Sequence, residues 1–359
     1  WETSNQLDIG IEAGLFKNRI YVSADFFDKR TRNLLYEQKL PNTTGFSKFW
    51  TNLGKVRFWG YELELTTRNI VKKNFSWESK LVLSYQQNKV LKLPDNGIDK
   101  NRTGGIALGD GTFFGGIAEG EPLNRFYGYV ATGIIETEEQ AANANYDALS
   151  RLPQKGAKRV GDYEWADRNG DGQITTADQF CLGVTVPPFT GGLQNSFRLK
   201  NWTLSLYLDW ATGHSIFDES YSRYFYGTFT NNYALAKVVL KAWKKPGDKT
   251  KYAKFYANDS NWGNDNYNRS PTNTFTYKGD YLCLREITLQ YSLPSKLFTK
   301  VGLKGVTLTV SGNNLCYLTE VKGISPETGA STTYEGSGDN AYYNYPPIRR
   351  FSFGVRLIF

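Results

Sequence analysis

Alternation of apolar and polar residues is the feature that most limits what this chain can fold into. In residues 350–359 the odd positions are Phe, Phe, Val, Leu and Phe, and the even positions are mostly small or charged. A period of two places each class of side chain on its own face of a β-strand. The same pattern recurs in 7–13, 20–26, 61–65, 75–85, 202–210, 287–291 and 306–310, and more weakly in 191–199. The sequence therefore predicts nine two-faced strands and an all-β fold.

The connections between these strands alternate between short and long. The short ones are 16–18, 69–74, 200–201 and 293–304, and the long ones are about 32–55, 90–188, 212–276 and 317–348. Transmembrane β-barrels have short periplasmic turns and long external loops, whereas a soluble β-sandwich has no reason to segregate its loops. We therefore expect an antiparallel barrel in the outer membrane of a Gram-negative cell, with 90–188 as a large extracellular loop region.

Composition argues against several other classes of protein. No stretch approaches the roughly 20 apolar residues that a membrane-spanning helix needs. The net charge is +8, but Lys and Arg are spread along the chain, which argues against nucleic-acid binding. The single histidine, His214, puts most His-dependent triads and zinc sites out of reach. We expect an outer-membrane barrel of this kind to be a transport protein and not an enzyme.

The three cysteines, Cys181, Cys283 and Cys316, are too few and too scattered for a disulfide scaffold or a CxxC metal cluster. Buried or lipid-facing thiols are the favoured interpretation. If residues 293–304 join adjacent strands, Cys283 and Cys316 fall nearly opposite each other, so one disulfide between them stays an open alternative.

The number of strands is odd, whereas bacterial single-chain barrels use even numbers. The first strand therefore has no partner on its N-terminal side, and an unpaired edge of that length invites aggregation. We expect an N-terminal portion that carries the remaining strands to lie outside this sequence. A passive porin, closed from nine or ten strands alone, is the alternative.

One segment of the longest connection matches a calcium-binding loop. Residues 167–178 fit the pattern D-x-N-x-D-G with an acid at the twelfth position. Gly172 would supply the sharp turn and Ile174 would pin the loop to its surroundings. The alternative is a turn without metal, and Asp162 and Glu164 just upstream are expected to be solvated. The predicted structural Ca²⁺ ligands are Asp167, Asn169, Asp171, the Gln173 carbonyl, Thr175 directly or through water, and Asp178.

Short motifs follow one another along nearly the whole chain. They are Trp1-Glu2 with 7–10 (LDIG), 28–35 (DKRTRNLL), 52–56 (NLGKV) with 60–63 (GYEL), 120–122 (GEP) with 126–129 (FYGY), 161–162 (GD), 279–287 (GDYLCLREI), 313–315 (NNL), 324–327 (ISPE) and Phe359. In this order they resemble the C-terminal half or so of the SusC/RagA-like TonB-dependent transporters of Bacteroidota. The resemblance implies a plugged barrel of about 22 strands, of which residues 1–359 form the C-terminal part, with the plug domain and the TonB box absent.

The same resemblance implies a function and partners. We expect active import of a nutrient driven through TonB, with an oligosaccharide as cargo, a peptide as the alternative, and a SusD-like surface lipoprotein as a lid. Phe359 resembles the signal that barrel-assembly machinery recognises. Aromatic residues of the long loops either stack on cargo or pack against the lid, and packing is the favoured interpretation. They lie at 221–226, 255–256, 262, 267 and 342–345.

Overall fold

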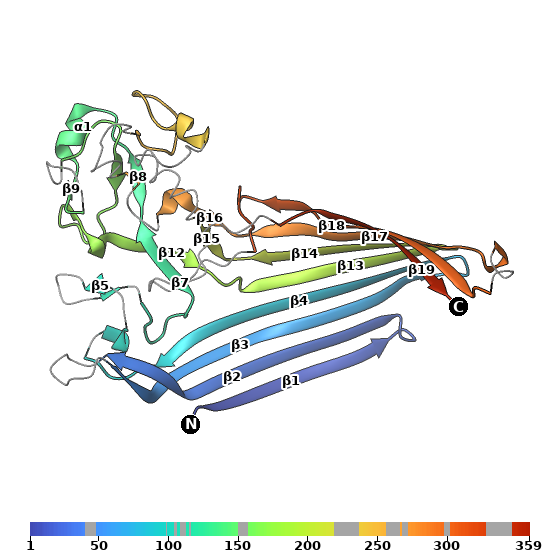
Figure 1. Ribbon diagram of the computed structural model, residues 1–359. Coiled ribbons are helices and arrows are strands. Elements are labelled where there is room, and N and C mark those ends of the chain that lie inside the picture. The colour runs from blue at the N-terminus through green and yellow to red at the C-terminus, as the bar shows by residue number, and fades with distance from the viewer. Residues whose placement is uncertain are drawn as a thin grey trace.

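Nine long antiparallel strands form one twisted sheet in the computed structural model (Figure 1). The structure describes residues 1–39, 48–97, 99–103, 106–107, 113–114, 116–149, 157–218, 237–255, 266–267, 272–297, 302–327 and 347–359. The sheet runs in the order β1 (Thr3–Leu15), β2 (Ile20–Lys39), β3 (Lys48–Val71), β4 (Phe75–Lys92), β13 (Phe189–Leu199), β14 (Trp202–Thr212), β17 (Tyr281–Ser292), β18 (Gly305–Thr319) and β19 (Arg350–Ile358). All nine predicted strands and their up-and-down order are confirmed, and β1 and β19 are the two edges of the sheet.

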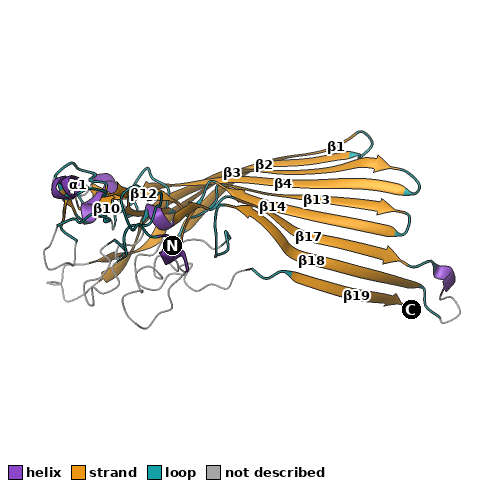
Figure 2. Cartoon of the chain, turned by 90° about the horizontal axis from the view of Figure 1, so that it is seen from above, coloured by secondary structure: helices purple, strands orange, loops and turns teal. Residues whose placement is uncertain are grey.

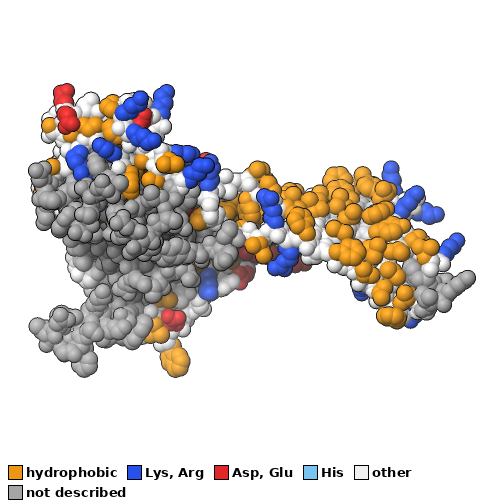
Figure 3. Space-filling view, turned by 45° about the horizontal axis from the view of Figure 1, so that its top comes forward, with side chains coloured by type: hydrophobic (Ala, Val, Ile, Leu, Met, Phe, Trp, Pro, Cys, Tyr) orange, Lys and Arg blue, Asp and Glu red, His pale blue; other side chains and the backbone are white. Residues whose placement is uncertain are grey.

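One face of this sheet is mostly apolar from edge to edge. Cross-strand pairing places Leu83 between Leu63 and Gly191, and the same face continues to the terminal strand. Its side chains stay open to the surroundings: Ile11 is 68% exposed and Phe353 is 70% exposed. Apolar side chains gather over the strand region of the molecule (Figure 3). A continuous apolar surface on an unstacked sheet is what the hydrocarbon of a bilayer covers.

The opposite face is polar, and charged side chains pair across its strands. Lys80 Nζ lies 2.7 Å from Glu64 Oε1, and Arg68 lies 3.7 Å from Glu78. Exposed ion pairs of this kind contribute little to stability, typically about 0–1 kcal/mol each. The charged side chains keep this face hydrated, so it is the side of the sheet that turns away from lipid.

The short connections gather at one end of the sheet and the long ones at the other (Figure 2). The turn between β1 and β2 is tight: Phe16, Lys17 and Asn18 all have positive φ angles, between 54° and 60°. The predicted long connection at 32–55 is largely wrong, because β2 and β3 stay paired as far as Lys39 and Lys48. Bulges around Leu34 shift the register there, so the period of two is lost from the sequence although pairing continues.

At the long-loop end the chain forms short two-stranded pairs and short helices. The pairs are β7 (Arg125–Tyr129) with β12 (Gln179–Val184), β8 (Ala131–Ile134) with β10 (Tyr163–Trp165), β9 (Tyr146–Asp147) with β11 (Gln173–Ile174), β15 (Ser215–Phe217) with β16 (Thr276–Lys278), and β5 (Ile106–Ala107) with β6 (Phe113–Phe114). The helices are α1 (Glu138–Asn143), η2 (Asp99–Asn101), η3 (Thr176–Asp178), η5 (Lys237–Lys241) and η6 (Asn273–Phe275), and η7 (Ser295–Leu297) lies in a turn at the opposite end. None of the helices in these ranges is long and apolar enough to cross a membrane.

The alternative of a disulfide between Cys283 and Cys316 is wrong. Cys283 pairs with Tyr317, and Cys316 pairs with Leu284, so the two cysteines are one position out of register. Neighbouring positions on a strand point to opposite faces, and side chains that point apart cannot be bridged. Both thiols are free, with Cys283 buried and Cys316 exposed.

We expect the stability of the protein to respond differently to a charge introduced on each face. Leu83→Arg places a guanidinium among Leu63 and Gly191 on the apolar face, which is expected to cost about 2–4 kcal/mol near the middle of a bilayer. Ser23→Arg is the matched control, because its cross-strand neighbours Glu12 and Glu64 lie on the polar face. Urea unfolding of the full-length protein in lipid vesicles measures both changes. Equal destabilisation by the two substitutions would contradict the assignment of the faces.

Candidate functional site

A concavity of about 500 Å³ lies on the polar face of the sheet. Residues of β4, β13, β14 and β17 line it, among them Ser84, Thr190 and Gln194. Tyr207 lies over Gly192, where an added Cβ would meet its hydroxyl oxygen at 2.9 Å. The glycine therefore makes room for an aromatic ring laid against the wall. Hydroxyl, amide and ring surfaces side by side suit a polar ligand with some apolar faces.

Arg285 organises the outer edge of this concavity. Its guanidinium donates to both carboxylate oxygens of Asp209, each at 2.8 Å, and to Asn314 Oδ1 at 2.8 Å. It also donates to the Tyr317 hydroxyl at 3.1 Å and pairs with Glu327. A bidentate guanidinium fixes both the distance and the plane of its partners. Arg285 thus fastens β14, β18 and the segment that ends at Glu327 to one point of the wall.

Sequence patterns did not single out Arg285 or Tyr207. Arg285 sits in a bulge, where β17 carries an extra residue between Leu284 and Glu286. A bulge turns two consecutive side chains toward one face. The sequence does contain a sign of this bulge, because two adjacent charged residues, Arg285 and Glu286, interrupt an alternating strand.

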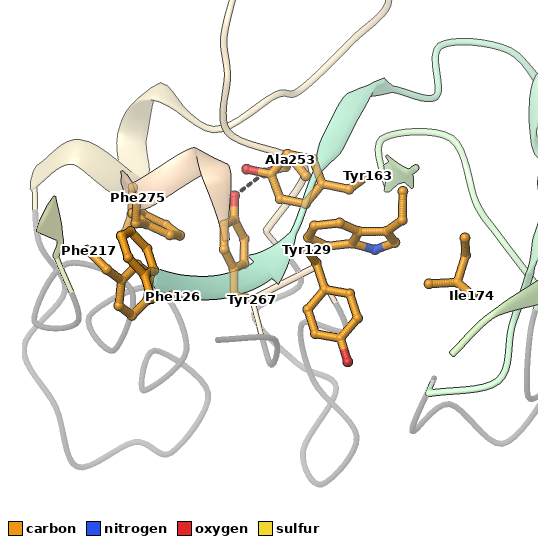
Figure 4. Packing of buried hydrophobic residues seen from close by; sticks show 10 residues of the cluster. Phe126, Tyr129, Tyr163, Ile174, Phe217, Ala253, Tyr267 and Phe275 are labelled. Carbon is orange, nitrogen blue, oxygen red and sulfur yellow. Dashed lines mark hydrogen bonds between the residues drawn. The ribbon is translucent and has the colours of Figure 1, made fainter. Parts of the chain in front are cut away.

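The two longest connections pack together into one unit with its own apolar core. We call this the loop unit; it comprises the described parts of residues 116–184 and 215–278. Its buried cluster is built mainly from aromatic rings (Figure 4). Tyr163 and Trp165 lie with ring centroids 5.2 Å apart, and Tyr163 and Tyr267 with centroids 5.8 Å apart. The cluster consists of Phe126, Tyr129, Tyr163, Trp165, Ile174, Phe217, Val239, Ala253, Tyr267 and Phe275.

Two asparagines tie the first long connection to the second. Asn266 Oδ1 accepts the Tyr163 backbone N–H at 2.9 Å, and Asn266 Nδ2 donates to Asp162 Oδ1 at 3.0 Å. Asn273 bonds both the N–H and the C=O of Ala131. Side-chain amides here replace strand pairing by satisfying backbone groups that the core would otherwise leave unpaired.

Burial changes the ionisation of the tyrosines in this core. It raises the pKa of Tyr163 to about 12 and the pKa of Tyr267 well above its usual value. The Tyr163 hydroxyl donates to the Lys251 carbonyl at 2.8 Å, and the Tyr267 hydroxyl donates to the Ala253 carbonyl (Figure 4). Of the aromatic residues proposed for cargo or lid contacts, Tyr267 is therefore core and Phe255 packs against it. The ranges 221–226 and 342–345 and the residues at 256 and 262 lie outside the described residues.

The predicted calcium loop forms a compact turn at the edge of the loop unit. Asp167 accepts the N–H groups of Gly170 and Gly172 at 2.7 and 2.8 Å, and both glycines have positive φ angles. Ile174 is fully buried, as expected. The ladder with β9 uses the carbonyls of Gly172 and Ile174, the neighbours of the proposed ligand Gln173.

The remaining predicted ligands are hydrogen-bonded within the loop. Asp171 accepts the Asn169 amide at 2.8 Å, and buried Asp178 caps η3 by accepting the N–H and hydroxyl of Thr175. Among the described residues, no three His, Cys, Asp or Glu side chains are grouped so that they could hold a metal ion. The carboxylates of Asp167, Asp171 and Asp178 thus do not converge, and calcium binding stays a prediction.

The structure also shows the positions of four other residues discussed from the sequence. Asp162 was expected to be solvated, and this is wrong: it is 3% exposed and bonds Arg159 and Asn266, whereas Glu164 is exposed. His214 is buried beyond β14, with Nε2 3.3 Å from the Pro326 carbonyl, and burial lowers its pKa. Phe359 follows β19 and is exposed, and its role in assembly stays a prediction.

Removing Asn266 is expected to loosen the loop unit without affecting the sheet. Asn266→Ala leaves the Tyr163 N–H and one oxygen of Asp162 without this partner, which costs about 1–3 kcal/mol for a buried group. Asn143→Ala, at an exposed position of α1, is the control. Limited proteolysis of the intact protein in membranes should cut the loop unit faster in the first variant only. Equal cutting rates would contradict the role given to Asn266.

Comparison with known proteins shows the family to which this chain is similar. The family model described as "TonB dependent receptor-like, beta-barrel" matches residues 1–315. TonB-dependent receptor P3 of Formosa agariphila is 31% identical over all of this chain and 34% of its own length. TonB-dependent receptor SusC of Bacteroides thetaiotaomicron is 24% identical over all of this chain and 32% of its own length. The chain thus spans about a third of the length of these relatives.

A solved structure shows the same fold. The RagAB peptide transporter superposes with a TM-score of 0.71 at 22% identity, covering 99% of this chain and 35% of that one. The aligned region covers nearly the whole chain, so it includes both the nine-stranded sheet and the loop unit. With the family model matching most of the sequence, the chain belongs to the TonB-dependent receptor-like β-barrel proteins of the outer membrane, which are receptors and transporters and not enzymes.

Proposed function

We propose that this chain forms part of the wall of an active importer that takes an oligosaccharide across the outer membrane. One observation carries the proposal: a membrane-type sheet has an apolar face and, on its other face, a polar concavity with a ring laid flat at Gly192. Because the chain spans about a third of its relatives, we infer that the rest of a longer protein supplies further strands and the plug.

The lining of the concavity favours a sugar. Tyr207 offers a ring face, and Ser84, Thr190 and Gln194 offer hydroxyl and amide groups. Sugars present hydroxyl groups around an apolar ring face, so this combination matches them on both counts. Asp209 is already held by Arg285 at 2.8 Å, so it serves as an oriented acceptor and not as a free charge.

A peptide is the second candidate cargo. The RagAB structure with a similar fold is described as a peptide transporter. A peptide would find charged partners at the Arg285 cluster, where Glu327 and Asp209 flank one guanidinium. The oligosaccharide remains the first choice because the groups that line the concavity itself are mostly neutral.

The position of the loop unit supports the partner that the family resemblance implies. It gathers at the long-loop end of the sheet, which is the external end in barrels of this kind (Figure 1). We propose that a SusD-like lipoprotein sits on this unit as a lid. Coupling to TonB would use the part of the importer that lies outside this sequence.

Tyr207→Ala tests the cargo proposal. Loss of a stacking contact worth about 1.4 kcal/mol would raise the Kd for an oligosaccharide about tenfold. Tyr85→Ala is the control, since Tyr85 is next to Ser84 on β4 but points to the apolar face. Calorimetric titration of the full-length protein with its lipoprotein compares oligosaccharides with peptides of similar size. Binding of peptides only, with the same dependence on Tyr207, would favour the second candidate.

We also propose that residues 167–178 bind calcium. The spacing of the oxygen donors and the two glycines with positive φ support this, as does the backbone of Gln173 between two paired carbonyls. A bound cation would draw Asp167, Asn169 and Asp171 toward one centre and stiffen the external loop, with no catalytic part.

Calcium is expected to protect this loop from proteases. In the wild-type protein a chelator should increase cleavage within 160–180, because bound cations hold the three side chains together. Asp171→Ala should abolish the calcium effect, while Glu164→Gln, exposed and just outside the loop, should keep it. Mass mapping of the cleavage sites provides the measurement. Cleavage that does not respond to calcium in the wild type would rule out the site.

A further inference from the structure

The turns at the short-loop end carry only positive charge. We call these turns the turn rim: residues 16–19, 72–74, 200–201 and the described parts of 293–304. They contain no Asp or Glu in the sequence. The cations of the turn rim are all exposed, and within the described residues none forms a salt bridge; they are Lys17, Arg19, Lys72, Lys73, Lys200, Lys296 and Lys304. Basic side chains project at this end of the molecule, beside the apolar side chains of the sheet (Figure 3).

Two of these turns are joined at one corner. The Lys200 backbone N–H donates to the Asn74 carbonyl at 2.8 Å, so the β3–β4 turn lies against the β13–β14 turn. This contact brings the stretches that hold Lys72, Lys73 and Lys200 together on the rim. Three ammonium groups at one corner, with no carboxylate in either turn, create a local positive potential at the membrane surface.

A chain of polar groups runs across the apolar face inward of the same corner. Thr67, Ser79 and Asn195 are cross-strand neighbours on β3, β4 and β13. Hydrogen bonds connect them in one direction: Thr67 Oγ1 donates to Asn69 Oδ1, Asn69 Nδ2 to Ser79 Oγ, and Ser79 Oγ to Asn195 Oδ1 at 2.7 Å. Trp77 Nε1 also donates to Asn195 Oδ1, at 3.0 Å.

This series of hydrogen bonds ends at the side-chain amide of Asn195, a donor on the face that meets the bilayer. Both hydrogen bonds to Asn195 go to its oxygen, and its Nδ2 has no partner among the described residues. Asn195 lies four positions before Leu199, the end of β13, which is about 14 Å along a strand at roughly 3.4 Å per residue and about 10 Å of depth at a tilt near 45°. A free amide N–H costs free energy in hydrocarbon unless an acceptor reaches it.

We propose that this corner binds one anionic phospholipid of the inner leaflet. The lysines of the two joined turns hold its phosphate, and the Asn195 amide donates to an ester carbonyl of its glycerol backbone. Both parts of the lipid are acceptors only, and both parts of the site are donors only. Trp77 and Phe197, stacked with centroids 5.6 Å apart, lie between the two levels and pack against the acyl chains.

The lipid is favoured over a soluble anion by the position of the polar chain. A free phosphate could meet the lysines but could not reach Asn195, which lies inside the apolar face with Leu193 and Phe197 on either side along β13. The two features are independent, one a matter of charge in the turns and the other a matter of hydrogen bonding on the strands. A phospholipid is the ligand that spans both.

Native mass spectrometry of the full-length protein, extracted with phosphatidylglycerol or phosphatidylcholine, tests the proposal. The variant K72E/K73E/K200E should retain phosphatidylglycerol about tenfold less than wild type, with phosphatidylcholine little changed. Asn195→Leu should reduce retention of both lipids by a similar factor, because both have ester carbonyls. K244E/K245E/K249E, with the same charge change at exposed positions of the loop unit, should behave as wild type.

Three outcomes would overturn the proposal. One is a rim variant that retains phosphatidylglycerol like wild type, and another is a loop-unit variant that loses it equally. The third is displacement of the lipid by inorganic phosphate at matched concentration, which would indicate an anion site without lipid recognition. K72Q/K73Q/K200Q and a heat-modifiability gel, which reports barrel folding, keep the test valid if the charge reversal impairs assembly.

Discussion

Backbone hydrogen bonding in the absence of water is the constraint on which the rest of this structure depends. In hydrocarbon every N–H and C=O must find a partner within the protein, and here each strand between β1 and β19 meets that need through two neighbours. The side chains are then free to divide between two solvents. Leu83 meets lipid, while Ser84 beside it lines the polar concavity.

This division moves the apolar core to an unusual place. The strands leave large side chains such as Phe353 exposed, and the buried apolar cluster of the described residues lies in the loops instead. Aromatic rings around Tyr163 and Tyr267 pack there because the loop unit meets water and must bury its own apolar surface. The sheet is stabilised by lipid and the loop unit by its core, so the two parts respond to different solvents.

The sequence predicted the parts of the fold in which the period of two is unbroken. All nine strands and the opposite facing of neighbours such as Leu83 and Ser84 followed from alternation. The features at β-bulges could not be predicted. The pairing of β2 with β3 beyond Leu34 and the orientation of Arg285 depend on register shifts, which interrupt the alternation of apolar and polar residues.

The candidate site was less accessible from sequence than the fold. Asp162 looked solvated because its partner Asn266 is 104 residues away, and the concavity depends on four strands from three distant parts of the chain. The calcium pattern was visible because all of its proposed ligands are local. Contacts between distant residues have no signature in a single sequence, and the cargo depends on them.

The tie between Asn266 and Tyr163 has a consequence for the order in which the protein assembles. The two residues are 103 positions apart in the sequence, and the segment between them includes all of β13 and β14, so the loop unit joins two segments separated by a membrane hairpin. Bringing such distant segments together carries a closure entropy that placement of the hairpin in the sheet largely removes. The loop unit should therefore mature only after β13 and β14 have inserted, and a surface for a lid would exist only on barrels that are already in the membrane.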